Sequence, residues 1–205
     1  RGAALLAGAE HVLLATARGL AIRFPETDVR RMGRTARGVR GIKLRKDDKV
    51  IGLGVARPAA ALLTVCENGY GKRTDLEEYR SQSRGGLGLK DIQATERNGP
   101  VVEVAVVGVT DDGVLVTAHG MPIRTPAAEI STIGRNTQGV RLMNLKEGDR
   151  CLAAAVVAPE DEEEAQRRSG PAGRTAPSDD AGPADDEAED TASGDGDTDT
   201  AGEEE

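Results

Sequence analysis

The sequence repeats itself. Residues 23–44, RFPETDVRRMGRTARGVRGIKL, align without a gap to residues 124–145, RTPAAEISTIGRNTQGVRLMNL, at a constant offset of 101. The identical pairs are Arg23/Arg124, Pro25/Pro126, Gly33/Gly134, Arg34/Arg135, Gly38/Gly139, Val39/Val140, Arg40/Arg141 and Leu44/Leu145. Such an internal repeat indicates an architecture of similar units that pack against one another.

A third copy lies halfway along this offset. The second glycine-to-arginine segment, GYGKRT, corresponds to the segment from Gly19 to Arg23, and RSQSRGGLGLKDI follows it. We expect this middle copy to be about three residues shorter before its glycine cluster at residues 85–88. The chain therefore contains three repeats of about fifty residues.

Short apolar runs alternate with turn residues in each repeat. HVLLAT, AALLTV and GVLVTA precede a glycine turn, and VIGLGVA, VVEVAVVGV and CLAAAVV follow a second turn. Such runs are typical of β-strands, and no window shows sustained helical periodicity. About four short strands per repeat predict an all-β fold of the β-propeller or β-pinwheel type, with four-stranded blades at about residues 1–58, 59–108 and 109–158. Because three blades are too few to close a ring, we expect the chain to be part of a longer protein.

Charge divides the chain at about residue 158. Residues 1–158 contain 24 Lys and Arg against 17 Asp and Glu, whereas residues 159–205 contain 3 against 18. The acidic part has no aromatic residue, so it buries too little apolar surface to offset the entropy of ordering. We expect residues 159–205 to be a disordered acidic tail behind a basic folded body.

The body has three aromatic residues, Phe24, Tyr70 and Tyr79, which are too few to form its core. The core must therefore consist mainly of aliphatic residues. Cys66 and Cys151 are too few for a disulfide framework and lie in apolar runs, which favours buried free thiols in a reducing cytoplasm. The sequence shows no apolar stretch of membrane-spanning length and no signal-peptide pattern.

Residues 29–44, VRRMGRTARGVRGIKL, concentrate positive charge without an acidic residue. Such a run is usually a solvated face. Three features favour an anion-binding surface instead: no acids are interleaved, Arg with its planar fork is used over Lys, and Arg34 and Arg40 recur as Arg135 and Arg141. Equivalent positions on successive blades would give an arc of positive charge.

The scarcity of aromatic residues separates two kinds of nucleic-acid binding. Single strands and RNA are usually stacked on aromatic platforms, whereas contacts to duplex phosphates need only Lys, Arg, main-chain N–H groups and hydroxyls. The sequence therefore favours sequence-tolerant, salt-sensitive binding of double-stranded DNA that bends along the surface. The predicted phosphate contacts are Arg30, Arg31, Arg34, Arg37, Arg40, Lys43, Arg84, Lys90, Arg135 and Arg141.

ENGYGKRT followed by YRSQSRGGLGLKDI, with DVRRMGRTARGVRGIKL and IRTPAAEISTIGRNTQGV, resembles the last three blades of the C-terminal β-pinwheel of the DNA gyrase A subunit, from about Gly2 to Ala158. The resemblance implies a six-bladed domain that wraps DNA around its rim, so that the holoenzyme supercoils DNA negatively. It also implies a cytoplasmic, chromosome-associated A2B2 heterotetramer with the gyrase B subunit, contacted through an upstream region. ATP and Mg²⁺ would be carried by other parts of that holoenzyme.

The sequence departs from the family pattern at its hallmark box, a Gln-Arg-Arg-Gly-Gly-type heptapeptide of the first blade. The nearest counterpart is QSRGGLG, where Ser83 and Leu87 replace basic residues. Neither Tyr70 nor Tyr79 has the winged-helix context of the family's cleavage tyrosine, so both are interpreted as structural. Some family members have acidic tails that modulate wrapping, which suggests that this tail competes with DNA for the basic rim.

We predict no catalytic or metal-binding residue. GYGKRT lacks the spacing of a phosphate-binding loop, GGLG lacks the third glycine of a dinucleotide motif, and His11 and His119 lie outside zinc-binding spacing. Two other functions remain open. One is the C-terminal domain of the paralogous topoisomerase IV subunit, and the other is a propeller that binds another protein.

Overall fold

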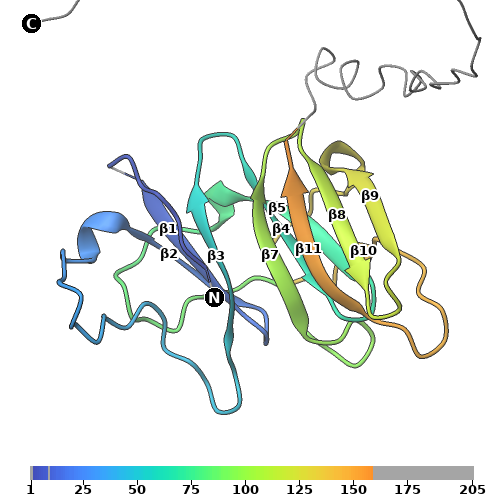
Figure 1. The fold of residues 1–205 in the computed structure, drawn as a ribbon, viewed down its shortest axis with the longest axis horizontal. Helices are drawn as coiled ribbons and strands as arrows, with labels where there is room; N and C mark the ends of the chain where they lie inside the picture. The colour runs from blue at the N-terminus through green and yellow to red at the C-terminus, as the bar shows by residue number, and fades with distance from the viewer. Residues whose placement is uncertain (1, 9, 159–205) are drawn as a thin grey trace, which may run out of the picture. The chain divides into compact units, whose positions relative to one another are not determined.

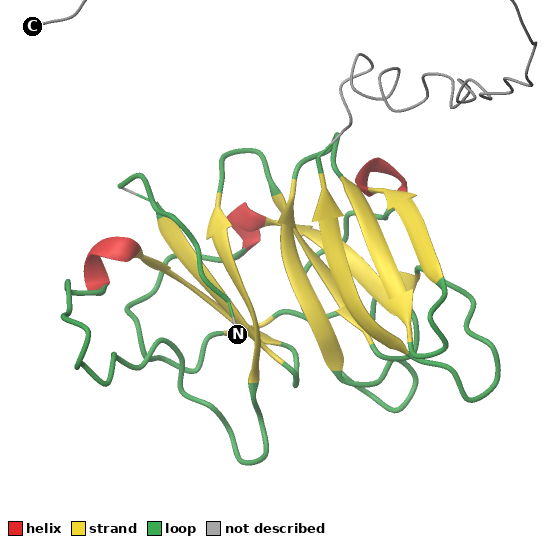
Figure 2. Ribbon diagram, in the orientation of Figure 1, coloured by secondary structure: helices red, strands yellow, loops and turns green. Residues whose placement is uncertain are grey.

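The structure is a computed structural model that describes residues 2–8 and 10–158. The acidic residues 159–205, which we expected to be disordered, lie outside the described residues. The described part of the chain forms strands β1 to β11 and three short 3-10 turns, η1 to η3 (Figure 1). Figure 2 shows the three turns along one end of the sheets, with the hairpin turns at the other end.

Three antiparallel sheets follow one another along the chain. The first has the order β3 (Val50–Ala56), β1 (His11–Thr16), β2 (Leu20–Pro25), β6 (Leu89–Lys90). The second has the order β10 (Val140–Arg141), β5 (Tyr70–Asp75), β4 (Ala61–Cys66), β7 (Val101–Val107). The third has the order β11 (Cys151–Val157), β8 (Asp112–Thr117), β9 (Pro122–Pro126).

Burial along the strands follows their place in the sheets. β4 lies inside the second sheet, and every one of its residues is buried. β9 lies at an edge of the third sheet and alternates exposed with half-buried residues. An interior strand covered on both faces gives a continuous apolar run, whereas a strand with one solvated face gives alternation.

The outermost strand of a sheet comes from the next repeat. β6 belongs to the second repeat but pairs with β2 of the first, with Lys90 opposite Leu20. β10 belongs to the third repeat and pairs with β5 of the second, with Arg141 opposite Tyr70. Successive repeats are therefore joined by main-chain hydrogen bonds as well as by side-chain packing.

The expectation that the middle repeat is about three residues shorter is wrong. Because β6 and β10 occupy equivalent places, residues 88–90 correspond to residues 38–40 and 139–141 at unbroken spacing from the shared arginines. The turns η1 (Glu26–Asp28), η2 (Leu76–Glu78) and η3 (Ala127–Glu129) keep the same spacing. The equivalent glycines are Gly38, Gly88 and Gly139, with a φ of 82°, 77° and 76°.

Strands β3, β7 and β11 form the inner side of the packed sheets, where β7 contacts both of the others (Figure 1). Gly52 and Gly54 of β3 leave room for Val104 and Val106 of β7. Aliphatic clusters fill the spaces between sheets. Since β6 and β10 lie at the opposite edges of their sheets, we call residues 29–43, 79–93 and 130–144 the outer edge.

The predicted all-β, propeller-type fold class is confirmed by these three successive sheets. Two of them have four strands, and the third has three among the described residues. In the first repeat, Val39 and Arg40 pair with no strand among the described residues, although their equivalents form β6 and β10.

Candidate nucleic-acid interface

Lys90 and Arg141 occupy equivalent places on the outer edge. Each is the last residue of a two-residue strand, and each lies opposite the first residue of the strand that follows a hairpin turn, Leu20 or Tyr70. Both side chains are exposed. The pairing register therefore brings two predicted phosphate contacts from different repeats onto the same edge.

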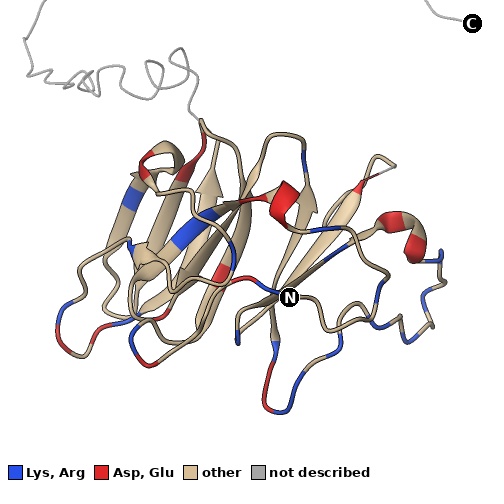
Figure 3. Cartoon of the chain, turned by 180° about the vertical axis from the view of Figure 1, so that it is seen from behind, with Lys and Arg blue, Asp and Glu red and all other residues tan. Residues whose placement is uncertain are grey.

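The basic stretch of the first repeat is an exposed loop between η1 and β3, and Figure 3 shows Lys and Arg spaced along it. The side chains of six predicted contacts are exposed there: Arg30, Arg31, Arg34, Arg37, Arg40 and Lys43. None of the six forms an ion pair with another described residue. Because these cations form no ion pair with a carboxylate among the described residues, an anion bound along the loop lowers the electrostatic energy.

Arg84 and Arg135 hold neighbouring repeats together. Arg84 donates from Nη1 to the carbonyl oxygen of Arg40 and from Nε to that of Asp28, 3.2 Å away. Arg135 donates from Nη1 to the carbonyl oxygen of Lys90, 3.3 Å away. The two side chains are half-buried and make equivalent contacts with the preceding repeat. Their contact with phosphate stays a prediction beside this joining role.

The arginine shared by the repeats also has a structural role. Arg23 donates from Nη1 to the carbonyl oxygen of Leu76 at 3.0 Å, and Arg73 donates from Nε to that of Ile130 at 2.8 Å. Each guanidinium therefore binds the main chain at or just after the 3-10 turn of the next repeat. A basic residue that recurs in each repeat can therefore indicate a contact between repeats as well as a basic surface.

Sequence reasoning missed Arg97, which lies in the turn before β7. Its Cζ is 4.7 Å from the centre of the Tyr70 ring, and the Cζ of Arg141 is 5.4 Å from the same centre. The repeat pattern gave no signal for Arg97, because its equivalents are Asp47 and Gly148.

Tyr79 is structural, as interpreted from the sequence. Its side chain is 1% exposed, and its hydroxyl donates to Oδ1 of Asp91 at 2.6 Å. The fully buried Lys72 has its Nζ 3.4 Å from the same oxygen and donates to the carbonyl oxygens of Asp91 and Gly134. Burial lowers the pKa of Lys72, which Asp91 partly offsets, and raises the pKa of Tyr79. Tyr70 is half-buried, and two guanidiniums lie close to its ring instead.

The two cysteines are buried free thiols, as predicted. Burial raises the pKa of Cys66 to about 12 and also raises the pKa of Cys151. Neither supplies a thiolate nucleophile at neutral pH. No group of His, Cys, Asp and Glu among the described residues could hold a metal ion. Within the same part of the chain, no helix is long and apolar enough to cross a membrane.

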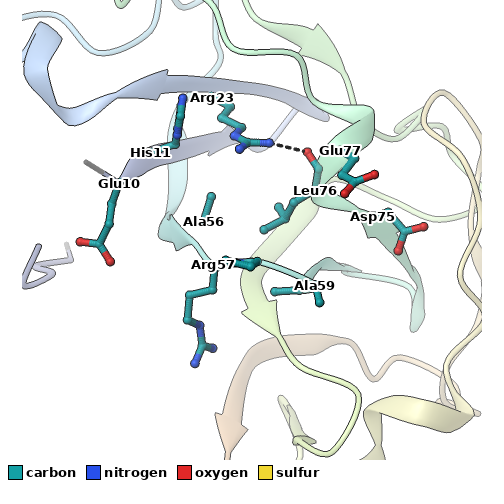
Figure 4. A pocket seen from close by; sticks show the side chains of 11 residues that line it. Glu10, His11, Arg23, Ala56, Arg57, Ala59, Asp75, Leu76 and Glu77 are labelled. Carbon is teal, nitrogen blue, oxygen red and sulfur yellow. Dashed lines mark hydrogen bonds between the residues drawn. The ribbon is translucent and has the colours of Figure 1, made fainter. Parts of the chain in front are cut away.

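A cavity of about 570 Å³ lies beside η2, at the end of the sheets away from the hairpin turns (Figure 4). Its lining mixes Arg23 and Arg57 with the carboxylates of Glu10, Asp75 and Glu77. Arg23 is already engaged with the main chain of η2, as the dashed line shows. The carboxylates disfavour a polyanion there, so the outer edge is the candidate interface.

Among the curated proteins similar to this chain are DNA gyrase A subunits. The chain is 46% identical over 165 residues to the DNA gyrase A subunit of Haloquadratum walsbyi and 48% identical over 164 residues to that of Salmonella typhimurium. Each alignment covers 80% of this chain and 19% of the relative. The chain therefore spans about a fifth of the length of these curated relatives.

Two solved structures have a similar fold. A DNA gyrase A C-terminal domain superposes with a TM-score of 0.68 at 29% identity, over 72% of this chain and 50% of that one. A C-terminal domain of DNA topoisomerase IV superposes with a TM-score of 0.73 at 21% identity, over 81% of this chain and 52% of that one, which shows the fold alone. The family described as DNA gyrase C-terminal domain, beta-propeller, matches residues 10–57, 61–107 and 114–158. These matches confirm the resemblance found in the sequence, and the chain belongs to the family of DNA gyrase C-terminal domains.

Proposed function

We propose that this chain binds and wraps duplex DNA as the C-terminal domain of a gyrase A subunit. One observation carries the proposal: exposed basic side chains that form no ion pair with another described residue lie along the outer edge, from residues 29–43 to Lys90 and Arg141. Guanidinium and ammonium groups spaced along one edge suit a row of phosphates. Membership of the gyrase family supports duplex DNA as the polyanion.

The mechanism is electrostatic and needs no bond chemistry from this chain. Basic residues on successive repeats replace counterions along the DNA backbone, and a curved path over several repeats repays the cost of bending the duplex. In a gyrase holoenzyme, the bent segment would present a DNA crossing to the strand-passage core. The A2B2 assembly with gyrase B, its use of ATP and Mg²⁺, and its location on the cytoplasmic chromosome belong to this proposal.

The first test compares two double variants with the same loss of charge. Arg34→Gln/Arg37→Gln removes two exposed guanidiniums of the outer edge, whereas Arg57→Gln/Arg124→Gln removes two exposed guanidiniums outside it, which pair with Asp111 and Asp112. In a mobility-shift titration at low salt, we expect the first variant to bind duplex DNA about tenfold or more weakly, because two phosphate contacts are lost, and the second to bind nearly as the parent does. Equal weakening of both variants, or no binding of duplex DNA by the parent chain, contradicts the proposal.

The second test separates gyrase from topoisomerase IV. We expect the full-length protein, assembled with its B subunit, ATP and Mg²⁺, to drive relaxed circular DNA to negative supercoiling. Relaxation or decatenation without negative supercoiling would assign the chain to the paralogous enzyme, whose C-terminal domain has the same fold.

A further inference from the structure

Two guanidinium groups lie close to one aromatic ring, that of Tyr70, which is paired with Arg141 of the outer edge. Arg97 and Arg141 have their Cζ atoms 4.7 and 5.4 Å from the centre of the Tyr70 ring. Arg141 also donates from Nη2 to the Tyr70 hydroxyl at 3.0 Å. A ring face attracts a cation, and the hydroxyl fixes the orientation of one guanidinium. Tyr70 therefore positions both arginines.

The backbone that carries Arg97 is held in place by side-chain hydrogen bonds. Asn68, in the preceding hairpin turn, donates to the carbonyl oxygens of Glu96 and Arg97 at 3.0 and 3.2 Å. Asn98 is fully buried and donates to the carbonyl oxygen of Gln138 at 3.0 Å. The Gln138 side chain in turn accepts from Nη1 of Arg97 at 3.3 Å. The site is preorganised, so a ligand need not order the turn.

The charge of the pair is not neutralised within the described residues. Neither Arg97 nor Arg141 forms an ion pair with another described residue. Two like charges held beside one ring repel each other, and a bound anion relieves that repulsion. The equivalent positions of the first sheet are Leu20, Lys90 and Asp47, which have one basic residue in place of two and no aromatic ring.

We propose that Tyr70, Arg97 and Arg141 form a phosphate-binding site on the outer edge, in which Tyr70 positions the two guanidiniums around one phosphodiester group. The inference deepens the proposed function and rests on it, because the phosphodiester belongs to the backbone of bound duplex DNA. Two planar guanidinium forks offer paired N–H donors that match phosphate oxygens. Tyr70 acts through the arginines and is a positioning residue.

The first experiment measures duplex affinity of the whole chain, four single variants of the site and one control variant. We expect Arg97→Gln and Arg141→Gln each to weaken binding about three- to tenfold and to reduce the salt slope by about one. Tyr70→Phe keeps the ring and loses the hydroxyl, so we expect about a twofold loss, and Tyr70→Leu, which installs the Leu20 side chain, loses about two- to fivefold. Arg57→Gln is the charge-matched control, and thermal unfolding shows whether each variant remains folded.

Combining the substitutions distinguishes positioning from general destabilisation. If Tyr70 acts through the arginines, Tyr70→Leu has no further effect on affinity in the Arg97→Gln/Arg141→Gln background. An undiminished effect of Tyr70→Leu in that background overturns the positioning role. Unchanged affinity of both arginine variants overturns the site itself.

The second experiment uses Tyr70 as its own probe. The chain has two tyrosines and no tryptophan, and burial raises the pKa of Tyr79, so the ultraviolet change of the phenolate that forms at lower pH reports Tyr70. The hydrogen bonds and charges of Arg141 and Arg97 lower the pKa of Tyr70. A bound phosphate offsets those charges, so we expect the Tyr70 titration to shift to higher pH when a short duplex or inorganic pyrophosphate is added.

The two ligands separate failure of the site from failure of the proposed function. A shift with pyrophosphate but no binding of duplex DNA retains an anion site and rejects both the DNA ligand and the proposed function. DNA binding without a shift of the Tyr70 titration rejects the site and leaves the proposed function standing. We expect a shift with both ligands, and expect Arg97→Gln to reduce it.

Discussion

At the scale of single residues, four interior positions are polar in the second repeat and apolar in the third. Thr64, Lys72, Tyr79 and Asp91 correspond to Leu115, Ile123, Ile130 and Leu142. The sequence shows this change from apolar to polar, but it does not predict that the four side chains meet around one carboxylate. They meet because the outer strand β6 crosses to the preceding sheet and brings Asp91 with it.

Breaking this buried network should cost far more than replacing it. Lys72→Ile leaves the buried Asp91 carboxylate without its cation and two carbonyl groups without their donor, so we expect a loss of about 3–5 kcal/mol in the free energy of unfolding. The quadruple variant carrying the residues of the third repeat removes all four polar side chains together and should be more stable than Lys72→Ile alone. Urea denaturation measures both. A quadruple variant less stable than the single one contradicts this account.

Alkaline pH should destabilise the fold through Cys66. Burial raises the pKa of Cys66 to about 12, so above about pH 9 the unfolded chain releases a proton that the folded chain retains. Stability then falls as pH rises, by up to about 1.4 kcal/mol per pH unit from this residue. Tyr79 acts in the same direction, and Lys72, whose pKa burial lowers, acts in the opposite one.

The variant Cys66→Thr isolates the cysteine, because Thr16 and Thr117 occupy its equivalent positions. We expect the stability difference between parent and variant to change with pH above about pH 9 and to stay constant below about pH 8. Parallel stability curves for the two proteins across this range would exclude the proposed contribution of Cys66.

At the scale of elements, the long strands could be predicted from the sequence and the outer strands could not. Apolar runs bounded by turn residues indicated the hairpins and the inner strands. β6 and β10 have two residues each, which is too short for any periodicity, and their partners belong to another repeat. The middle repeat looks shorter in the sequence because two extra glycines, Gly85 and Gly86, precede Gly88, which is the glycine equivalent to those of the other repeats.

Gly88 should be the more sensitive of two equivalent glycines. Gly38 and Gly88 both have a positive φ, so alanine costs about 1–2 kcal/mol at either position. At Gly88 a Cβ would also lie 2.5 Å from the carbonyl oxygen of Ala21, whereas at Gly38 no atom lies within 4 Å. We expect Gly88→Ala to lower the free energy of unfolding by more than Gly38→Ala does. Equal losses in urea denaturation would show that β6 does not pack on β2 in this way.

At the scale of the whole molecule, the position of the basic residues could be predicted from the sequence, but which of them join neighbouring repeats could not. The recurrence of basic residues located the edge that carries Lys90 and Arg141. It did not show that Arg84 and Arg135 bind carbonyl groups of the preceding repeat, because that depends on the crossing of chain segments. The sequence does not indicate a role for Arg97, because the other two repeats have no arginine at the equivalent position.

The acidic residues 159–205 should weaken DNA binding by the basic body. Their 18 carboxylates against 3 basic residues compete with phosphates for the same cations, so deletion of the segment should tighten duplex binding at low salt and change it little at high salt. A segment of equal length with Asn and Gln in place of Asp and Glu is the matched control, and it should behave like the deletion. Unchanged low-salt affinity in both variants would remove the idea.

The salt dependence of duplex binding tests the central claim most directly. If the outer edge binds phosphates, the logarithm of the affinity falls linearly with the logarithm of salt concentration, with a slope of up to about −7 for the eight exposed predicted contacts. The account predicts the same slope for two duplexes of unrelated sequence, and a slope shallower by about 2 for Arg34→Gln/Arg37→Gln. A slope near zero, or one unchanged in that variant, would contradict it.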